Sequence, residues 1–270
     1  MDSALRDARL GLRRFERFVE LDENEGRRTM QCVHNLVGRT SRMHDPWWMH
    51  VLLASHIVSG VAAFVLAPLA LITAKGGKAH RRWGKFYFWC IAAVASTALV
   101  MALWRPVLFL ALVAVFSFYA AFGAYRVLGQ KAASRGEPVV RALDWLAAIL
   151  CLGASAALVV LGAIRPQLVQ NLRIPSIVLG LVGVRISAAA IMRFTHPPTD
   201  KMFWWYVHLQ GMIGSYIAAW TAFCLVTVGP LLHGAWWLWL LPISIGLPAI
   251  FATKAYYRQR FRSRRDALPV

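Results

Sequence analysis

Seven long blocks of apolar residues run along this chain, separated by short polar or basic segments. A helix needs about 20 residues to cross the roughly 30 Å hydrocarbon core of a bilayer. Strands of a membrane barrel alternate apolar and polar residues, whereas these blocks are apolar throughout. The pattern therefore predicts an all-α, polytopic transmembrane helical bundle of about seven spans, at residues 49–73, 86–104, 107–127, 142–164, 175–192, 203–228 and 235–253.

The blocks divide the chain into three parts. Residues 1–42 form a polar arm, residues 43–253 form the transmembrane domain, and residues 254–270 form a basic tail. Hydrophobic residues make up 59% of the chain, whereas soluble domains usually contain about 45–50%. The composition therefore agrees with a membrane protein, and the bilayer is the expected environment.

Lysine and arginine residues after position 74 fall in alternate gaps between the blocks. The odd-numbered gaps and the tail hold seventeen of them, and the even-numbered gaps hold three. Because loops rich in Lys and Arg stay on the cytoplasmic side, the odd gaps and the C-terminus are expected in the cytoplasm. We predict a multi-pass protein of the bacterial inner (plasma) membrane.

The formal net charge of +18 is also explained by the basic loops and tail of a membrane protein. The arm contributes little of this charge, since it holds nine Arg and seven acidic residues. A nucleic-acid-binding protein needs a basic face on a folded aqueous domain, and the remaining charge lies in short loops and the tail. We therefore expect attraction to anionic lipid headgroups and no nucleic-acid partner.

Arg185 is the clearest ionisable residue inside a predicted span. An arginine at the centre of a membrane helix costs about 3 kcal/mol on insertion scales, so we expect Arg185 to face the bundle. It can there meet a bound anion, such as a haem propionate, a lipid phosphate or a substrate carboxylate. The alternative is hydrogen bonding to carbonyls and hydroxyls of neighbouring helices. No acidic residue lies in the middle of a predicted span to pair with Arg185, and Asp144 lies at the edge of the fourth span.

Three histidines are the next candidates, because imidazole ligates haem and metals. His56 and His208 lie in spans one and six, which enter from opposite sides, so at 1.5 Å per residue they fall in opposite leaflets. His80 lies in the first cytoplasmic loop and pairs better with His208, with Arg81 and Arg82 beside it for haem propionates or lipid headgroups. The pair suggests haem b or a quinone; the alternative is that these histidines bond neighbouring helices or face water.

Other chemistry has little support in the sequence. The four cysteines form no CxxC pair, and no hydrolase triad or phosphate-binding glycine loop occurs. The sequence thus contains no catalytic constellation, and only a redox role would make the protein an enzyme. Gly211 and Gly214 are spaced as a small-residue helix-packing seam.

A resemblance covers most of residues 50–228. A first span with His-Ile-x-x-Gly runs into an Ala-Pro step, and a basic loop with His-Arg-x-x-Gly-Lys-x-Tyr follows, carried here by His56, Ile57, Gly60, Ala67, Pro68, His80, Arg81, Gly84, Lys85 and Tyr87. Together with Phe116-Ser117-Phe118-Tyr119 and the segment 208–223, these residues resemble a bacterial family of predicted membrane proteins, domain of unknown function 2306. The His-Arg-x-x-Gly element is also similar to one in ferric-reductase-type haem domains, whose second His on the same helix has no counterpart here.

Three functions follow from these residues. The first is binding or passage of a small solute, anion or lipid within the bundle around Arg185, with His56 and His208 as polar lining. The second is a membrane redox protein that holds haem or quinone near His80 and His208. The third is a non-catalytic subunit that assembles with a partner membrane protein or with further copies of itself.

The arm 1–42 conflicts with the expected orientation. Seven spans and a cytoplasmic C-terminus place the N-terminus outside, whereas the nine arginines of the arm oppose translocation to that side. We expect translation to begin at Met43, which leaves only a short tail outside; the alternative is a genuine extension with one span miscounted. The intact mass of protein made from the native gene decides. A mass that includes residues 1–42 contradicts the Met43 start.

Overall fold

The computed structural model describes residues 46–130, 140–169, 172–196, 198–200, 202–228 and 236–266. Every regular element in these ranges is helical. The long helices are α2 (Trp47–Ile72), α3 (Lys78–Trp104), α4 (Leu108–Arg126), α5 (Ala142–Ile164), α6 (Arg173–Thr195), α7 (Phe203–Phe223) and α9 (Leu240–Asp266). Short turns of helix join some of them: η2 (Pro166–Val169), η3 (Cys224–Val228) and η4 (Trp236–Trp239). The polar arm and Met43 lie outside the described residues.

The predicted all-α bundle is confirmed. Within the described part of the chain, six helices are long and apolar enough to cross a membrane: α2 to α7, with η3 extending the last of them. The seventh predicted span, 235–253, falls on η4 and the first half of α9. Two helices run well beyond the predicted spans: α3 begins at Lys78 rather than at residue 86, and α9 continues to Asp266 rather than ending at residue 253.

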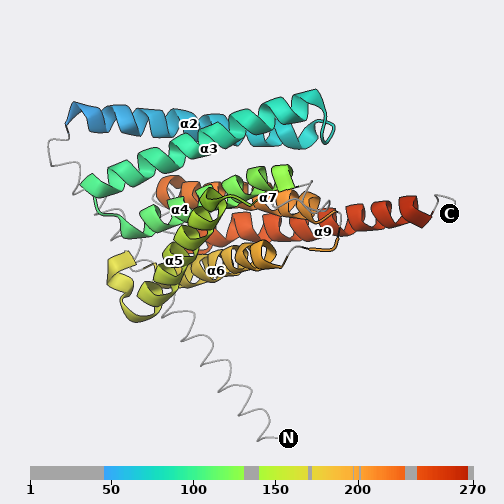
Figure 1. The fold of residues 1–270 in the computed structure, drawn as a ribbon. Coiled ribbons are helices and arrows are strands. Elements are labelled where there is room, and N and C mark those ends of the chain that lie inside the picture. The colour runs from blue at the N-terminus through green and yellow to red at the C-terminus, as the bar shows by residue number, and fades with distance from the viewer. Residues whose placement is uncertain are drawn as a thin grey trace, which may run out of the picture.

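Helix α4 is the centre of the bundle. It packs against α3, α5 and α7, while α2 lies along α3, α6 along α5 and α9 along α7. Figure 1 shows α2 and α3 on one side of α4 and α7, with α5 and α6 on the other, and α9 running out of the bundle toward the C-terminus. This arrangement places α4 between two groups of helices.

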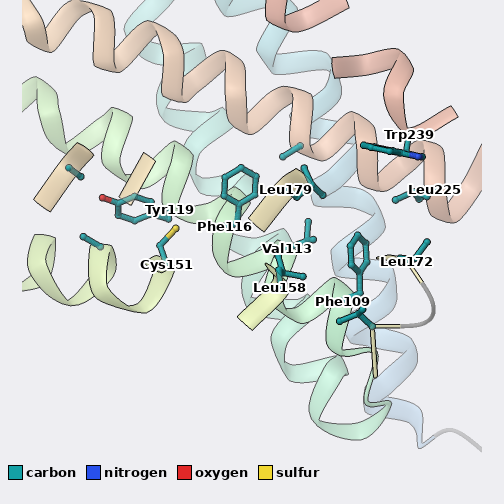
Figure 2. Close-up of a cluster of buried hydrophobic side chains, with 14 residues drawn as sticks. Phe109, Val113, Phe116, Tyr119, Cys151, Leu158, Leu172, Leu179, Leu225 and Trp239 are labelled. Atoms are coloured by element: carbon teal, nitrogen blue, oxygen red, sulfur yellow. The ribbon is translucent and has the colours of Figure 1, made fainter. Parts of the chain in front are cut away.

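Two hydrophobic clusters hold these groups to α4. The larger joins α4 to α5, α6 and the η3–η4 region, through residues that include Phe109, Phe116, Leu158, Leu179 and Trp239 (Figure 2). The smaller joins α4 to α2 and α3 through Ala63, Ala67, Tyr87, Phe88, Ile91 and Ala121. Small residues dominate the α2 side of the second cluster, so the backbone of α2 comes close to its neighbours.

Proline 68 leaves one backbone group of α2 without its usual partner. Proline has no N–H, so the carbonyl four residues earlier, that of Phe64, loses its helical hydrogen bond. The hydroxyl of Tyr216 on α7 donates to this carbonyl at 3.4 Å. A carbonyl in hydrocarbon has no water to replace the lost bond, so this contact ties α7 to α2.

The two glycines expected to form a packing seam on α7 do not both contact another helix. A Cβ at Gly211 would lie 2.7 Å from the carbonyl oxygen of Ala120 and 2.7 Å from the Cβ of Ala124, whereas a Cβ at Gly214 meets nothing within 4 Å. Gly211 therefore allows α7 to lie against α4, and Gly214 has no such role.

These two glycines form a matched pair for a stability test. We expect Gly211→Ala to destabilise the bundle by about 1–3 kcal/mol, the usual cost of overpacking. Gly214→Ala is expected to be neutral or to stabilise by up to about 1 kcal/mol, because alanine favours helix. Thermal unfolding in one detergent measures both; equal melting temperatures for the two variants would contradict the close approach of α7 to α4.

Candidate ligand-binding site

A cavity of about 630 Å³ lies among α2, α3, α4 and α7. It sits at the end of the bundle where α2 and α4 end and where α3 and α7 begin, because it is lined by Leu71, His80, Leu128 and Trp204. Its size is within the range of about 300–1,000 Å³ that is usual for small-molecule sites. Its walls come from residues 67–87, 125–129 and 204–216.

His80 lines this cavity from the first turn of α3. The prediction of a loop position was wrong, because α3 begins at Lys78 and includes the basic segment before the apolar block. The Nδ1 of His80 lies 2.9 Å from the carbonyl oxygen of Ala70. Ala70 is in the last turn of α2, where carbonyls have no helical N–H partner. His80 thus closes the end of α2 and joins it to α3.

His208 makes the equivalent contact between α7 and α4. Its Nδ1 lies 2.9 Å from the carbonyl oxygen of Ala124, in the last turn of α4. Gly211, one turn further along α7, provides the close approach that brings the imidazole within reach. His208 also lines the cavity.

The two imidazoles face the same space. Their ring centroids are 6.3 Å apart, and their planes are inclined by 77°. The sequence favours His80 and His208 as the better pair. The structure brings these two rings together, although the residues are 128 positions apart in the chain.

His56 lies far from this pair. Its Nδ1 is 3.1 Å from the carbonyl oxygen of Val94 and 3.0 Å from the hydroxyl of Thr97, both on α3. Since His80 is also on α3, the two histidines are separated by about 21–25 Å of helix. His56 therefore joins α2 to α3 and does not line the cavity.

Basic side chains surround the cavity. Lys75, Arg81 and Lys85 contribute to its lining. Partial burial lowers the pKa of Lys75, which lies between α2 and α3, below that of an ordinary lysine. Arg82 is different: its guanidinium lies over the rings of Trp83 and Phe86, at 5.8 and 5.9 Å from their centroids. Of the two candidate anion-binding arginines, only Arg81 lines the cavity.

Arg126 is a lining residue that the sequence reasoning missed. Its Nε and Nη2 donate to the two carboxylate oxygens of Asp144 at 2.7 and 2.8 Å, and Asp144 also accepts from the N–H of Arg141 at 2.9 Å. Asp144 is almost fully buried, at 3% exposure. One feature of the sequence could have indicated this ion pair: Arg126 and Asp144 lie on either side of the same predicted gap between spans.

Arg185 does not face the bundle, and that prediction was wrong. Its side chain is exposed, as are those of its neighbours Leu181 and Val182. The reason is that α6 packs on α5 through its small residues: a Cβ at Gly180 or Gly183 would lie under 3 Å from Ser155 or Val159. Arg185 is on the opposite side of the helix. The arginine of α6 with a buried guanidinium atom, its Nε, is Arg193.

The described residues contain no group of three or more His, Cys, Asp or Glu side chains placed to hold a metal ion. Comparisons with family models, with curated proteins and with solved structures find no match to this chain. The resemblance to the domain of unknown function 2306 therefore stays a prediction, and the site is interpreted from its own geometry.

Replacing Asp144 tests how firmly Arg126 is held at the cavity wall. We expect Asp144→Asn to lower the free energy of unfolding by about 2 kcal/mol, because a neutral amide cannot form the paired charged hydrogen bonds. Asp200→Asn is the matched control: the side chain of exposed Asp200 accepts from the N–H of Met202 at 2.8 Å, and asparagine serves equally well at a helix start. Equal stability of both variants would contradict the account.

Proposed function

We propose that this multi-pass membrane protein binds an anionic amphiphile in the cavity among α2, α3, α4 and α7. Such a ligand has an apolar body and a phosphate or carboxylate group. The observation that carries the proposal is the combination of a largely apolar wall with basic side chains, while no Asp or Glu of the described residues lines the cavity.

The basic side chains suit an anionic group. Lys75, Arg81 and Lys85 come from the end of α2 and the start of α3, and Arg and Lys form the strong, charge-assisted hydrogen bonds that hold phosphates and carboxylates. The charge of Arg126 is already balanced by Asp144, whereas Lys75 donates to the neutral carbonyl oxygen of Leu71. The three residues of the α2–α3 region are therefore the ones proposed to meet the ligand.

The remaining wall suits the apolar body. Ala67, Leu71, Met212 and Ile213 supply aliphatic surface, and Tyr216 supplies an aromatic ring. Sites of this kind bury most of a ligand against apolar side chains and orient it with a few polar groups. A molecule that partitions into membranes fits this wall better than a small hydrophilic solute does.

Binding is favoured over passage of a solute. Both binding and passage were expected around Arg185, with His56 and His208 as polar lining. Arg185 is exposed and His56 bonds to α3 elsewhere, so the three do not border one space. The cavity described above lies at one end of the bundle, which suits a binding site better than a path across the membrane.

We also propose that this end faces the cytoplasm of a bacterium. The segment 75–85 carries five basic residues, and loops of this kind stay on the cytoplasmic side of the inner membrane. The cavity would then draw its ligand from the anionic cytoplasmic leaflet, where lipid headgroups attract basic segments.

Substitutions of Arg81 and Arg82, combined with a lipid titration, test the proposal. The purified protein in neutral detergent is titrated with dioleoyl phosphatidic acid, with phosphatidylcholine and with inorganic phosphate, and the melting temperature is followed. We expect stabilisation by phosphatidic acid and none by phosphatidylcholine. Arg81→Ala removes a contact worth about 1 kcal/mol, which weakens the affinity roughly fivefold.

Arg82→Ala is the control, because Arg82 lies over aromatic rings and does not line the cavity. It is expected to bind phosphatidic acid like the unchanged protein. Equal weakening by both substitutions would point to non-specific attraction to the basic segment and contradict the cavity. If inorganic phosphate stabilises the protein as much as phosphatidic acid does, the anionic group suffices without an apolar body. That result would contradict an amphiphile as the ligand.

A further inference from the structure

The pair of imidazoles in the cavity is not explained by binding of an anionic lipid. A phosphate or carboxylate is held by the basic side chains, and an apolar chain needs no imidazole. Yet His80 and His208 come from different helices to lie with ring centroids 6.3 Å apart at the wall of one cavity. Their chemistry points to a more specific ligand.

The hydrogen bonds of the two rings select one tautomer. Each Nδ1 lies 2.9 Å from a main-chain carbonyl oxygen, that of Ala70 for His80 and that of Ala124 for His208. A carbonyl only accepts, so Nδ1 is the donor in both rings. The neutral imidazole then has its lone pair on Nε2. Metal-ligating histidines are held in this way, with the other nitrogen donating to a carbonyl or carboxylate.

The number and spacing of the two imidazoles suit an iron whose other ligands come from a bound cofactor. Metal–imidazole bonds are about 2 Å long, so two imidazoles on opposite sides of one metal have ring centroids roughly 6 Å apart. The described residues supply no third ligating group, which leaves four positions of an octahedral iron open. A porphyrin provides four nitrogens in a plane, and its axial ligands are commonly histidines.

We propose that the cavity holds a haem b, with His80 and His208 as the axial ligands on its two faces. This inference rests on the proposed function, because haem is an anionic amphiphile: a flat apolar ring with two carboxylates. Lys75, Arg81 and Lys85 are the residues that would meet the propionates, and the apolar wall meets the ring edge.

The test uses the full chain, produced in bacteria supplied with iron and 5-aminolaevulinate, purified in mild detergent and titrated with hemin. We expect one haem per chain and the low-spin spectrum of two imidazole ligands in the oxidised and reduced states. His80→Ala and His208→Ala are each expected to weaken hemin binding about tenfold or more and to abolish the low-spin spectrum. His56→Ala is the control and keeps it.

Alanine at either position also removes a bond between helices, so a variant that retains a ligand is needed. His208→Met keeps an axial ligand, since methionine also binds haem iron. It is expected to convert the spectrum to a histidine–methionine type while the protein stays monodisperse. An unchanged spectrum in His80→Ala and His208→Ala overturns the assignment of these ligands.

The outcome also separates this inference from the proposed function. If folded protein shows no Soret band, but Arg81→Ala still weakens the binding of phosphatidic acid relative to Arg82→Ala, the haem is overturned and the anionic-amphiphile site stands. If hemin and phosphatidic acid both fail to bind, both proposals fail. A quinone, which needs only one imidazole, would give the result with no Soret band and with phosphatidic acid still bound.

Discussion

The hydrogen bonding of backbone carbonyls that lack a helical partner shapes one end of this bundle. Helix ends and proline sites leave such carbonyls, which side-chain donors can satisfy. Three donors from α3 and α7 contribute: His80 bonds Ala70, His208 bonds Ala124, and Tyr216 bonds Phe64. The carbonyl of Ala70 also accepts from the hydroxyl of Thr73 at the end of α2. The end of α2, the end of α4 and the Pro68 site are thereby joined to their neighbours.

The same bonds create the cavity and its chemistry. A histidine that donates Nδ1 to a carbonyl of a neighbouring helix holds its ring in a fixed orientation, and two such rings face one space. The packing of α7 against α4 at Gly211 is what allows the second bond. The association of α7 with α4 and the shape of the cavity are therefore coupled, since a change that separates these helices also moves His208.

The sequence predicted the helices well and the orientation of their faces poorly. Apolar blocks locate spans directly, because length and composition decide insertion. The error at His80 arose because the basic start of α3 has the composition of a loop, although the helix begins at Lys78. The error at Arg185 arose because α6 is apolar on all sides, so only the contact of its small residues with α5 determines which side is buried. The pair His80 and His208 was predictable from depth. Arg126 and Asp144 flank one predicted gap between spans, but their hydrogen bonds depend on how α4 packs on α5.

An iron-edge anomalous difference map of crystals of the hemin-loaded full-length protein tests the central claim most directly. The account predicts one strong peak between the imidazoles of His80 and His208, at about 2 Å from the Nε2 atom of each. A peak at another place, or none between these two rings, would contradict it.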